Sequence, residues 1–229
     1  MKKAIIAMSG GVDSSVAAFV MKEKGYHIIG VTMKLYDNDD IGIDTEKTCC
    51  SLSDIEDARS VCYKLGAMYY VFNFKADFKE KIIDDFISTY EKGGTPNPCI
   101  RCNRYLKFEK LMQRMRELDY DYVVTGHYAR IEKQGDRYIL KKAVDLTKDQ
   151  SYVLYSMTQE QLAHTLFPVG EMHKDKIRDI AEENKLINAD KPDSQDICFI
   201  PDGDYAGFIT KRCGEQQSGD IVLSDGTKL

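Results

Sequence analysis

Short apolar runs alternate with longer amphipathic stretches along the first half of the chain. The apolar runs are five to eight residues long and rich in β-branched and aromatic residues, as buried strands are; they cover 4–8, 27–33, 67–74 and 120–124. Helical spacing of apolar residues appears between them, over 16–21, 53–65, 76–90 and around 107–115. This alternation predicts an α/β fold whose parallel sheet carries helices on both faces.

The pattern changes in the second half. Residues 130–142 alternate in character around Gly135-Asp136 and predict an antiparallel hairpin. A charged amphipathic helix is expected over 174–186, and 191–200 passes from a polar loop into an apolar segment. Residues 219–229 have the pattern of a strand, an Asp-Gly turn and the start of a partner strand, so we expect the chain to be a fragment that ends within a hairpin.

The first strand and first helix are joined by Ser9-Gly10-Gly11-Val12-Asp13-Ser14-Ser15. Two glycines allow a sharp turn with converging N–H groups, and the new helix adds unpaired donors and the positive end of its dipole. The stretch therefore predicts a phosphate site. It lacks the lysine of the common phosphate loop and the Gly-x-Gly-x-x-Gly spacing of dinucleotide folds, so phosphate should be held differently.

The Asp13 carboxylate adds a condition to the predicted phosphate site, because it carries negative charge. Beside bound phosphates it would need a divalent cation such as Mg²⁺ between them, or it would turn away to cap the helix. An ordinary capped helix after a glycine turn is the plain alternative.

Composition places the chain among ordinary globular proteins. An apolar content of 43% supports a buried core, and no run approaches the roughly 18 apolar residues of a membrane span, so we expect a cytoplasmic protein without a membrane partner. Seven cysteines, an odd number, without an export signal predict reduced thiols with chemical or ligand roles. The net charge of −5 gives no general support for nucleic-acid binding, although a local basic surface is compatible with it.

A second irregular loop, 93–104, contains two glycines, two prolines and the pair Cys99 and Cys102. A thiol at a helix N-terminus beside Arg101 and Arg104 should have a depressed pKa, which makes Cys102 a candidate nucleophile. The spacing also suits half a zinc site, a redox pair or two ligands of an iron–sulfur cluster. The remaining cysteines that we considered fit a plainer role as small apolar residues: Cys49, Cys50, Cys62 and Cys198.

Two further stretches are candidates for ligand binding. Thr125 to Arg130 lies at the carboxyl end of a predicted strand, where Gly126 would let a nucleotide approach and His127 and Arg130 could meet phosphate. The alternative is a buried histidine with satisfied hydrogen bonds and a surface arginine. The run 148–152 could contact RNA phosphates and bases, or could simply begin a solvated helix.

Five segments, taken in order, are 7–15, 97–99 with 102–103, 125–130, 148–152, and 193–194 with 197–200. Together they resemble the tRNA-specific 2-thiouridylase family within the ATP pyrophosphatase group, and the resemblance extends from the first strand to the last residue. It implies the PP-loop fold of the adenine-nucleotide alpha-hydrolases. It also implies an enzyme that adenylates the C2 oxygen of the wobble uridine with ATP and replaces it with sulfur, giving 2-thiouridine, AMP and pyrophosphate.

The resemblance assigns roles to individual residues. ATP would be bound by Ala7, Met8, Ser9, Gly10, Gly11, Val12, Asp13, Ser14, Met33 and Gly126, with Mg²⁺ offsetting the phosphate charge. The target base would be bordered by Asn97, Pro98 and Cys99, and tRNA would be touched by Lys148, Asp149 and Gln150. Cys198 would carry a persulfide received from a sulfur-relay protein or cysteine desulfurase, and Cys102 would release the sulfur by forming a disulfide with Cys198.

Some expectations stay open. Some members of that family have aspartate at the position of Cys99, which puts general acid–base duty there in doubt and makes a [4Fe–4S] cluster on Cys99, Cys102 and Cys198 worth testing. The family also has further domains, including a C-terminal β-barrel, so we expect 1–212 to be the catalytic domain and 213–229 the beginning of a small central domain. Weak tRNA binding follows, because phosphate contacts would be missing. A PP-loop synthetase that adenylates a small molecule for amidation is the runner-up.

Overall fold

The computed structural model describes residues 1–37, 52–193, 197–200, 202–214 and 219–228. Cys49 and Cys50 lie outside the described residues, as does Ser194.

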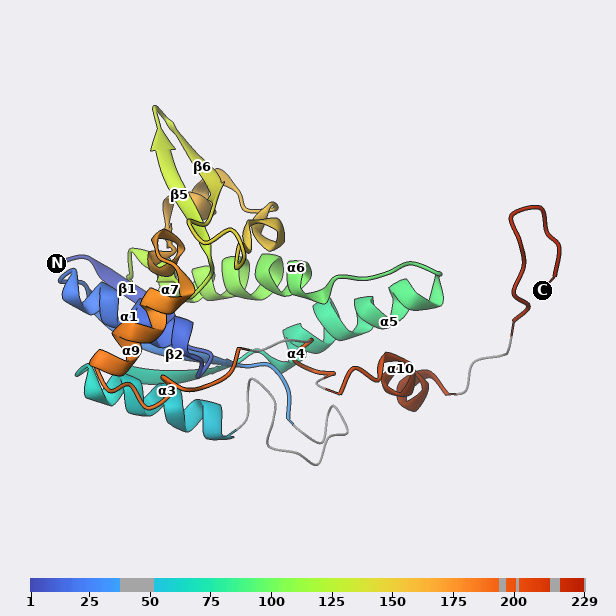
Figure 1. Ribbon diagram of the computed structural model, residues 1–229, viewed down its shortest axis with the longest axis horizontal. Helices are drawn as coiled ribbons and strands as arrows, with labels where there is room; N and C mark the ends of the chain where they lie inside the picture. Colours follow the sequence, from blue (N-terminus) through green and yellow to red (C-terminus); the bar gives the residue numbers. More distant parts are fainter. Residues whose placement is uncertain (38–51, 194–196, 201, 215–218, 229) are drawn as a thin grey trace.

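The centre of the fold is a parallel sheet of five strands (Figure 1). Its spatial order is β3-β2-β1-β4-β7, from β3 (Met68–Asn73), β2 (His27–Lys34), β1 (Lys3–Ala7) and β4 (Tyr122–Val124) to β7 (Thr165–Leu166). The register pairs Ile5 of β1 with Ile29 of β2 and with Val123 of β4. The central strand is therefore the one that leads into the glycine-rich loop.

Helices cover both faces of this sheet, as predicted. One face packs against α1 (Val12–Glu23), α3 (Leu52–Lys64) and α9 (Lys174–Glu183). The other packs against a helix that runs through α4 (Lys75–Phe78), a π-helical turn (Lys79–Ile83) and α5 (Asp84–Glu91). It also packs against a second composite helix, formed by α6 (Pro98–Cys102), a π-helical stretch (Asn103–Lys110) and α7 (Leu111–Glu117), and against α10 (Tyr205–Cys213).

The alternation of side chains along β1 explains why both faces are buried. Ala4 and Ile6 belong to the hydrophobic cluster under α1, α3 and α9, whereas Ile5 belongs to the cluster on the opposite face. Successive side chains of a strand point to opposite faces, so a wholly apolar strand needs a covering layer on each side.

Several predicted boundaries differ from the structure. The fourth strand begins at Tyr122 rather than at residue 120, and α9 ends at Glu183 rather than at 186, with Lys185 at a φ of +50°. The α3 helix begins at Leu52 and ends at Lys64, each one residue earlier than the predicted 53–65. The prediction missed β7, because two residues are too few to show a periodicity.

A hairpin of β5 (Ala129–Gln134) and β6 (Arg137–Lys142) rises from the end of the sheet (Figure 1) and confirms the prediction. Gly135 makes its turn with a φ of +58°. A third hydrophobic cluster lies at its base, where the sequence also forms a 3₁₀ turn (Ser151–Leu154), α8 (Gln159–Ala163) and a second 3₁₀ turn (Pro168–Glu171).

The end of the described chain, 219–228, contains an antiparallel bridge between Val222 and Lys228. Gly226 has a φ of +87°, in agreement with the predicted Asp-Gly turn. Whether 213–229 begins a separate domain stays a prediction; α10 itself packs through Phe208 on the second hydrophobic cluster of the sheet.

Substituting Gly170 by alanine is expected to destabilise the fold. A Cβ there would lie 1.8 Å from the carbonyl oxygen of Ala129 in β5. Because that atom belongs to the backbone, relief requires a shift of the hairpin, and overpacking of this kind lowers the free energy of unfolding by about 1–3 kcal/mol. Urea unfolding measures the change against Gly219→Ala, whose Cβ would meet nothing within 4 Å. Equal unfolding midpoints for the two variants would contradict the expectation.

Candidate functional site

The loop between β1 and α1 has the geometry of an anion site. Gly10 turns the chain with a φ of +76°, and Gly11 is the N-cap of α1 without a side-chain cap. Inside the loop, the Ser14 hydroxyl donates to the Gly11 carbonyl oxygen at 3.0 Å and accepts from the Ser9 backbone N–H at 3.2 Å. The first N–H groups of a helix have no partner within it, so this N-terminus presents donors and a positive dipole end to an anion.

Two neighbouring segments approach the loop too closely for side chains. A Cβ on Gly10 would lie 2.6 Å from the carbonyl oxygen of Asp54, at the start of α3. A Cβ on Gly126, just after β4, would lie 2.7 Å from the Ser14 backbone nitrogen. Gly126 thus lies beside the glycine loop 9–15, both glycines are required by backbone packing, and ATP binding by Gly126 stays a prediction.

Other residues predicted to bind ATP have buried side chains. Met8 and Val12 are in the hydrophobic cluster under α1 and are each 3% exposed. Any contact that they make with a nucleotide would be through the backbone. Met33, near the end of β2, and Ala7 are partly buried against the opposite cluster.

The Asp13 side chain forms no hydrogen bond that caps α1 in the described structure; it pairs with two residues from later in the chain. Its Oδ1 accepts from the Lys174 ammonium at 2.7 Å and from the Tyr128 hydroxyl at 2.7 Å. Lys174 begins α9, and its side chain is only 10% exposed. Burial and the neighbouring Asp13 carboxylate raise the pKa of Tyr128, so the hydroxyl keeps its proton and acts as a donor.

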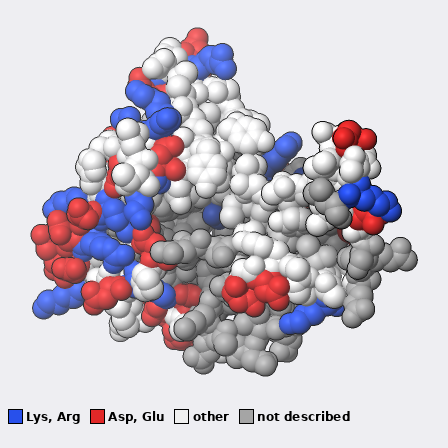
Figure 2. Space-filling model, turned by 45° about the vertical axis from the view of Figure 1, so that its right-hand side comes forward, with Lys and Arg blue, Asp and Glu red and all other residues white. Residues whose placement is uncertain are grey.

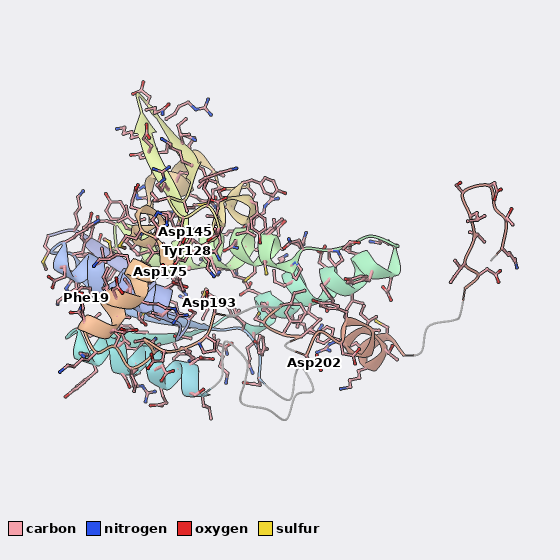
Figure 3. All side chains as sticks on the ribbon, viewed as in Figure 1. Phe19, Tyr128, Asp145, Asp175, Asp193 and Asp202 are labelled. Carbon is pink, nitrogen blue, oxygen red and sulfur yellow. The ribbon has the colours of Figure 1, made fainter. Side chains whose placement is uncertain are left out.

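The Lys174 ammonium also contacts Asp193 Oδ1 at 2.8 Å. Asp193 receives a second lysine, Lys148, on Oδ2 at 2.9 Å. Burial acts to raise the pKa of the Asp193 carboxyl, but the hydrogen bonds from Lys174 and Lys148 prevail and the pKa is lowered. Figure 3 places Tyr128, Asp145, Asp175 and Asp193 around this part of the molecule, between the hairpin and the ends of the sheet strands.

The segment 188–193 is held in place by the contacts of three further residues. The Asn188 side-chain amide donates to the Gly10 carbonyl oxygen at 2.9 Å and to the Ser15 hydroxyl at 2.7 Å. Lys191 pairs with Asp54 and Asp57 on α3. Arg178 of α9 donates to the Ala189 and Lys191 carbonyl oxygens. The segment that leads toward Cys198 is therefore held against the phosphate loop, which the sequence analysis did not predict.

His127 and Arg130 both have contacts within the chain. His127 is 8% exposed, packs against Phe108 and Phe167, and shares a 2.7 Å hydrogen bond with the Thr125 hydroxyl. Burial holds the pKa of His127 well below its ordinary value, so the ring is neutral. Arg130 donates to the Lys142 carbonyl oxygen across the hairpin. His127 therefore has the environment of the plainer alternative, and a phosphate contact of Arg130 stays a prediction.

The three residues predicted to touch tRNA all have partners within the chain. Lys148 pairs with Asp193, Asp149 accepts from Ala143 N and the Ser151 hydroxyl, and Gln150 exchanges hydrogen bonds with the Tyr128 backbone. These contacts fix the loop beside the Asp13 network. These contacts do not test whether the three side chains also contact RNA.

The helix begins earlier than predicted: α6 starts at Pro98, so Cys99 and Cys102 lie in the helix and only 93–97 of the predicted loop is irregular. Asn97 is the N-cap and accepts from the Ile100 backbone N–H, Pro98 follows it, and Cys99 is exposed. Cys102 and Cys198 are reduced and partly buried, and both pack against the hydrophobic cluster that contains Phe199. The Tyr36 hydroxyl donates to the Cys198 carbonyl oxygen at 2.6 Å. The two predicted catalytic cysteines thus border one cluster.

Among the described residues, His, Cys, Asp and Glu side chains form no group of three that could hold a metal ion. Cys99, Cys102 and Cys198 all lie within that set, so the fold as described does not gather them as cluster ligands. No helix in the described part of the chain has both the length and the apolar character needed to cross a bilayer.

Charges of both signs are mixed over much of the surface seen in Figure 2, in keeping with the net charge of −5. The hairpin differs, since residues 130–142 include five Lys or Arg and two Asp or Glu. This local excess of positive charge gives the hairpin a basic surface, although the chain as a whole has a negative net charge.

Two tRNA-specific 2-thiouridylases are among the known proteins similar to this chain. The chain is 52% identical over 229 residues to the tRNA-specific 2-thiouridylase MnmA of Clostridium acetobutylicum and 55% identical over 231 residues to that of Clostridioides difficile. Each alignment covers 100% of this chain and 64% of the relative, so the chain spans less than two thirds of their length.

Two solved structures are similar in fold. A 4-thiouridine synthetase in complex with RNA and ATP has a TM-score of 0.58 at 18% identity, over 87% of this chain and 45% of that one. The U34-tRNA thiolase NcsA of Methanococcus maripaludis, with its [4Fe–4S] cluster, has a TM-score of 0.53 at 17% identity, over 93% and 67%. These likenesses confirm the PP-loop type of sheet. A family model matches residues 2–202, most of the chain, which therefore belongs to the family described as the tRNA methyl transferase HUP domain.

Proposed function

We propose that this chain is the catalytic part of a tRNA 2-thiouridylase. The observation that carries the proposal is the fastening of the segment before Cys198 to the phosphate loop, through Asn188 and through Lys174 and Asp193. An enzyme that activates an oxygen with ATP and then replaces it with sulfur needs both functions at one place. The identity of 52% and 55% to the two 2-thiouridylases supports the same reaction.

ATP is proposed to bind with its phosphates on residues 9–14. The left-handed turn at Gly10 and the uncapped N-terminus of α1 fit a polyphosphate, because both leave backbone donors directed at an anion. The uridine C2 oxygen is a poor leaving group, and its adenylation converts it into AMP.

Mg²⁺ fits at the Asp13 carboxylate. Lys174 and Tyr128 both donate to Oδ1 of Asp13, and the Asp13 carboxylate would hold the cation. When bound, Mg²⁺ would neutralise charge on the phosphates and on the departing pyrophosphate. Lys174 and Tyr128 hold the carboxylate in place for that contact.

The sulfur chemistry is assigned to two cysteines. A persulfide on Cys198 attacks C2 of the adenylated uridine, AMP leaves, and the base is joined to Cys198 through the two sulfurs. The Cys102 thiolate then attacks the Cys198 sulfur, forms a disulfide with it and releases the thiolated base; a thiol reductant restores both cysteines. Asn97, Pro98 and Cys99, at the start of α6, would border the base.

The partners follow from this chemistry. The base must leave its stack to reach the pocket, and tRNA phosphates would meet the hairpin and the loop 148–150. A sulfur-relay protein or cysteine desulfurase would supply the persulfide, and the reaction is assigned to the cytoplasm. Binding of tRNA by this chain alone should be weak, since fewer phosphates are contacted than by a longer protein.

An iron–sulfur cluster does not fit the described arrangement, because the three cysteines are not gathered as a ligand group. We therefore derive no step through a cluster. The [4Fe–4S] centre of NcsA belongs to a protein only 17% identical to this chain.

Loading with sulfur is the direct test. Incubation with a cysteine desulfurase and cysteine, followed by alkylation and peptide mass spectrometry, should place one extra sulfur on the peptide of Cys198. The peptide of Cys213 is the internal reference, because burial and the neighbouring Glu91 raise the pKa of its thiol. Incubation with ATP and tRNA should then release AMP and yield a thiolated nucleoside. Extra sulfur confined to other cysteines would contradict the proposal, and AMP release with a small acceptor alone would favour an amide-forming synthetase.

A further inference from the structure

The α3 helix has a buried face and an exposed face. On the buried face Ala58, Val61 and Cys62 are each at most 1% exposed and pack in the cluster that covers the sheet. On the exposed face two large apolar side chains are almost fully accessible, Leu52 at 82% and Tyr63 at 87%. Single apolar residues are common at protein surfaces, so the spacing of these two decides whether they form one surface.

Leu52 and Tyr63 lie on the same side of the helix, because they are eleven residues apart, which is about three turns. Glu56 and Arg59 stand between them at intervals of four, three and four residues. Their side chains are 63% and 57% exposed and form an ion pair at 3.1 Å. Intervals of this kind mark the contact positions of two packed helices. We call these four residues the α3 stripe.

The α3 stripe is complementary to an inverted copy of itself. The midpoint between Glu56 and Arg59 is also the midpoint between Leu52 and Tyr63. In an antiparallel pair of α3 helices with a twofold axis through this point, Glu56 of each copy faces Arg59 of the other, and Leu52 faces Tyr63. A parallel pair would instead place identical charges side by side, which is unfavourable. The order of charges along α3 therefore fits a second, antiparallel copy of this helix.

The strand that α3 contacts provides further apolar surface. β3 is the outermost strand of the sheet, and Met68, Tyr70 and Val71 are between 41% and 55% exposed. The strand contains neither a charged residue nor a proline. Edge strands that remain in water usually carry such residues, because they prevent pairing with another chain. The β3 edge has no such protection in its own sequence.

We propose that this chain forms a symmetric dimer through the α3 stripe, and that the partner is a second copy of the chain. The proposal is independent of the proposed reaction. A helix of thirteen residues is about 20 Å long, so the contact is small compared with the roughly 800 Å² per partner of a standard interface. The dimer is therefore weak and depends on protein concentration, with a dissociation constant of about 10–100 µM.

Sedimentation equilibrium over about 5–500 µM protein, a range that brackets this constant, tests the proposal. Glu56→Arg places two arginines opposite each other, and Arg59→Glu places two glutamates opposite each other. Each variant alone should have a dissociation constant at least about tenfold higher than the wild type. An equimolar mixture of the two variants should dimerise like the wild type, because every arginine then faces a glutamate.

Glu117→Arg is the matched control, since it reverses one charge of the exposed pair of Arg114 and Glu117 on α7 and should leave dimerisation unchanged. Circular dichroism checks that every variant folds. If the variants of the charged pair do not fold, Tyr63→Ser removes one apolar end of the α3 stripe and should also weaken the dimer about tenfold.

A wild type that stays monomeric over the whole range overturns the inference, even if the α3 stripe binds a different protein. A dimer that these substitutions leave unchanged overturns it as well, because its interface then lies elsewhere. The mixture gives a third decision: two folded variants that remain monomeric together contradict the antiparallel pairing of Glu56 with Arg59.

Discussion

Replacing Cys198 by serine is expected to abolish formation of 2-thiouridine, by at least about a thousandfold, while ATP binding stays intact. A serine hydroxyl cannot carry a persulfide, and Cys198 is packed against a cluster on the face of the sheet away from α1, so the phosphate loop keeps its contacts. Thiolated nucleoside is measured by chromatography of digested tRNA, with a sulfur donor and excess ATP. A longer protein that contains this chain can be used if tRNA binding is weak.

Two other serine variants make this result specific. Cys213→Ser, at the exposed last residue of α10, should retain full thiolation. Cys102→Ser should still load sulfur on Cys198 and release AMP, but the base should remain attached to Cys198, which denaturing electrophoresis of labelled tRNA detects. Thiolation at the wild-type rate by Cys198→Ser would remove the cysteine relay.

Gly10→Ala is expected to weaken ATP binding by at least about tenfold, which corresponds to about 1.4 kcal/mol. Two effects combine at this position. A φ of +76° is unfavourable for alanine by roughly 1–2 kcal/mol, and the new Cβ would lie 2.6 Å from the Asp54 carbonyl oxygen. Relief of the contact moves either α3 or the loop, and the donors at the start of α1 lose their common direction. Isothermal titration calorimetry with Mg²⁺ and ATP measures the change.

Gly25→Ala separates these two effects. Gly25 has almost the same φ, +78°, but its Cβ would meet nothing within 4 Å. This variant should lose about 1–2 kcal/mol of unfolding free energy and keep the ATP affinity of the wild type. Folded Gly10→Ala with unchanged affinity would show that the close approach of Asp54 does not shape the phosphate site.

The sheet was predictable because its signals are local. The run 4–8 is apolar on both faces of a strand, and the glycines that follow it turn the chain within a few residues. The β7 strand was not predictable, since Thr165 and Leu166 become a strand only by pairing with β4. Tertiary pairing, rather than propensity, creates an element of that length.

The candidate site was predictable in part for the same reason. The glycine loop is a sequence pattern whose backbone geometry agrees with the prediction, whereas α6 begins inside the stretch that was predicted as a loop. Lys174 and Asn188 have no such signal: one looks like any charged residue of an amphipathic helix, and the other follows an ordinary apolar stretch. Their roles come from contacts with Asp13 and Gly10 across most of the chain. His127 illustrates the opposite case, since a histidine beside a predicted ligand site is buried among aromatic rings.

The glycine loop is held by Lys174 and Asn188, which lie far from it along the sequence, and this separation affects the order in which the fold forms during synthesis. Lys174 follows Asp13 by 161 positions and Asn188 follows Gly10 by 178, so the loop is synthesised well before the residues that hold it. Domains form in step with synthesis, so a growing chain can have β1 and α1 in place long before these contacts exist. The contacts of this loop are therefore completed late, and a nascent chain halted before residue 170 should bind nucleotide more weakly than the whole chain.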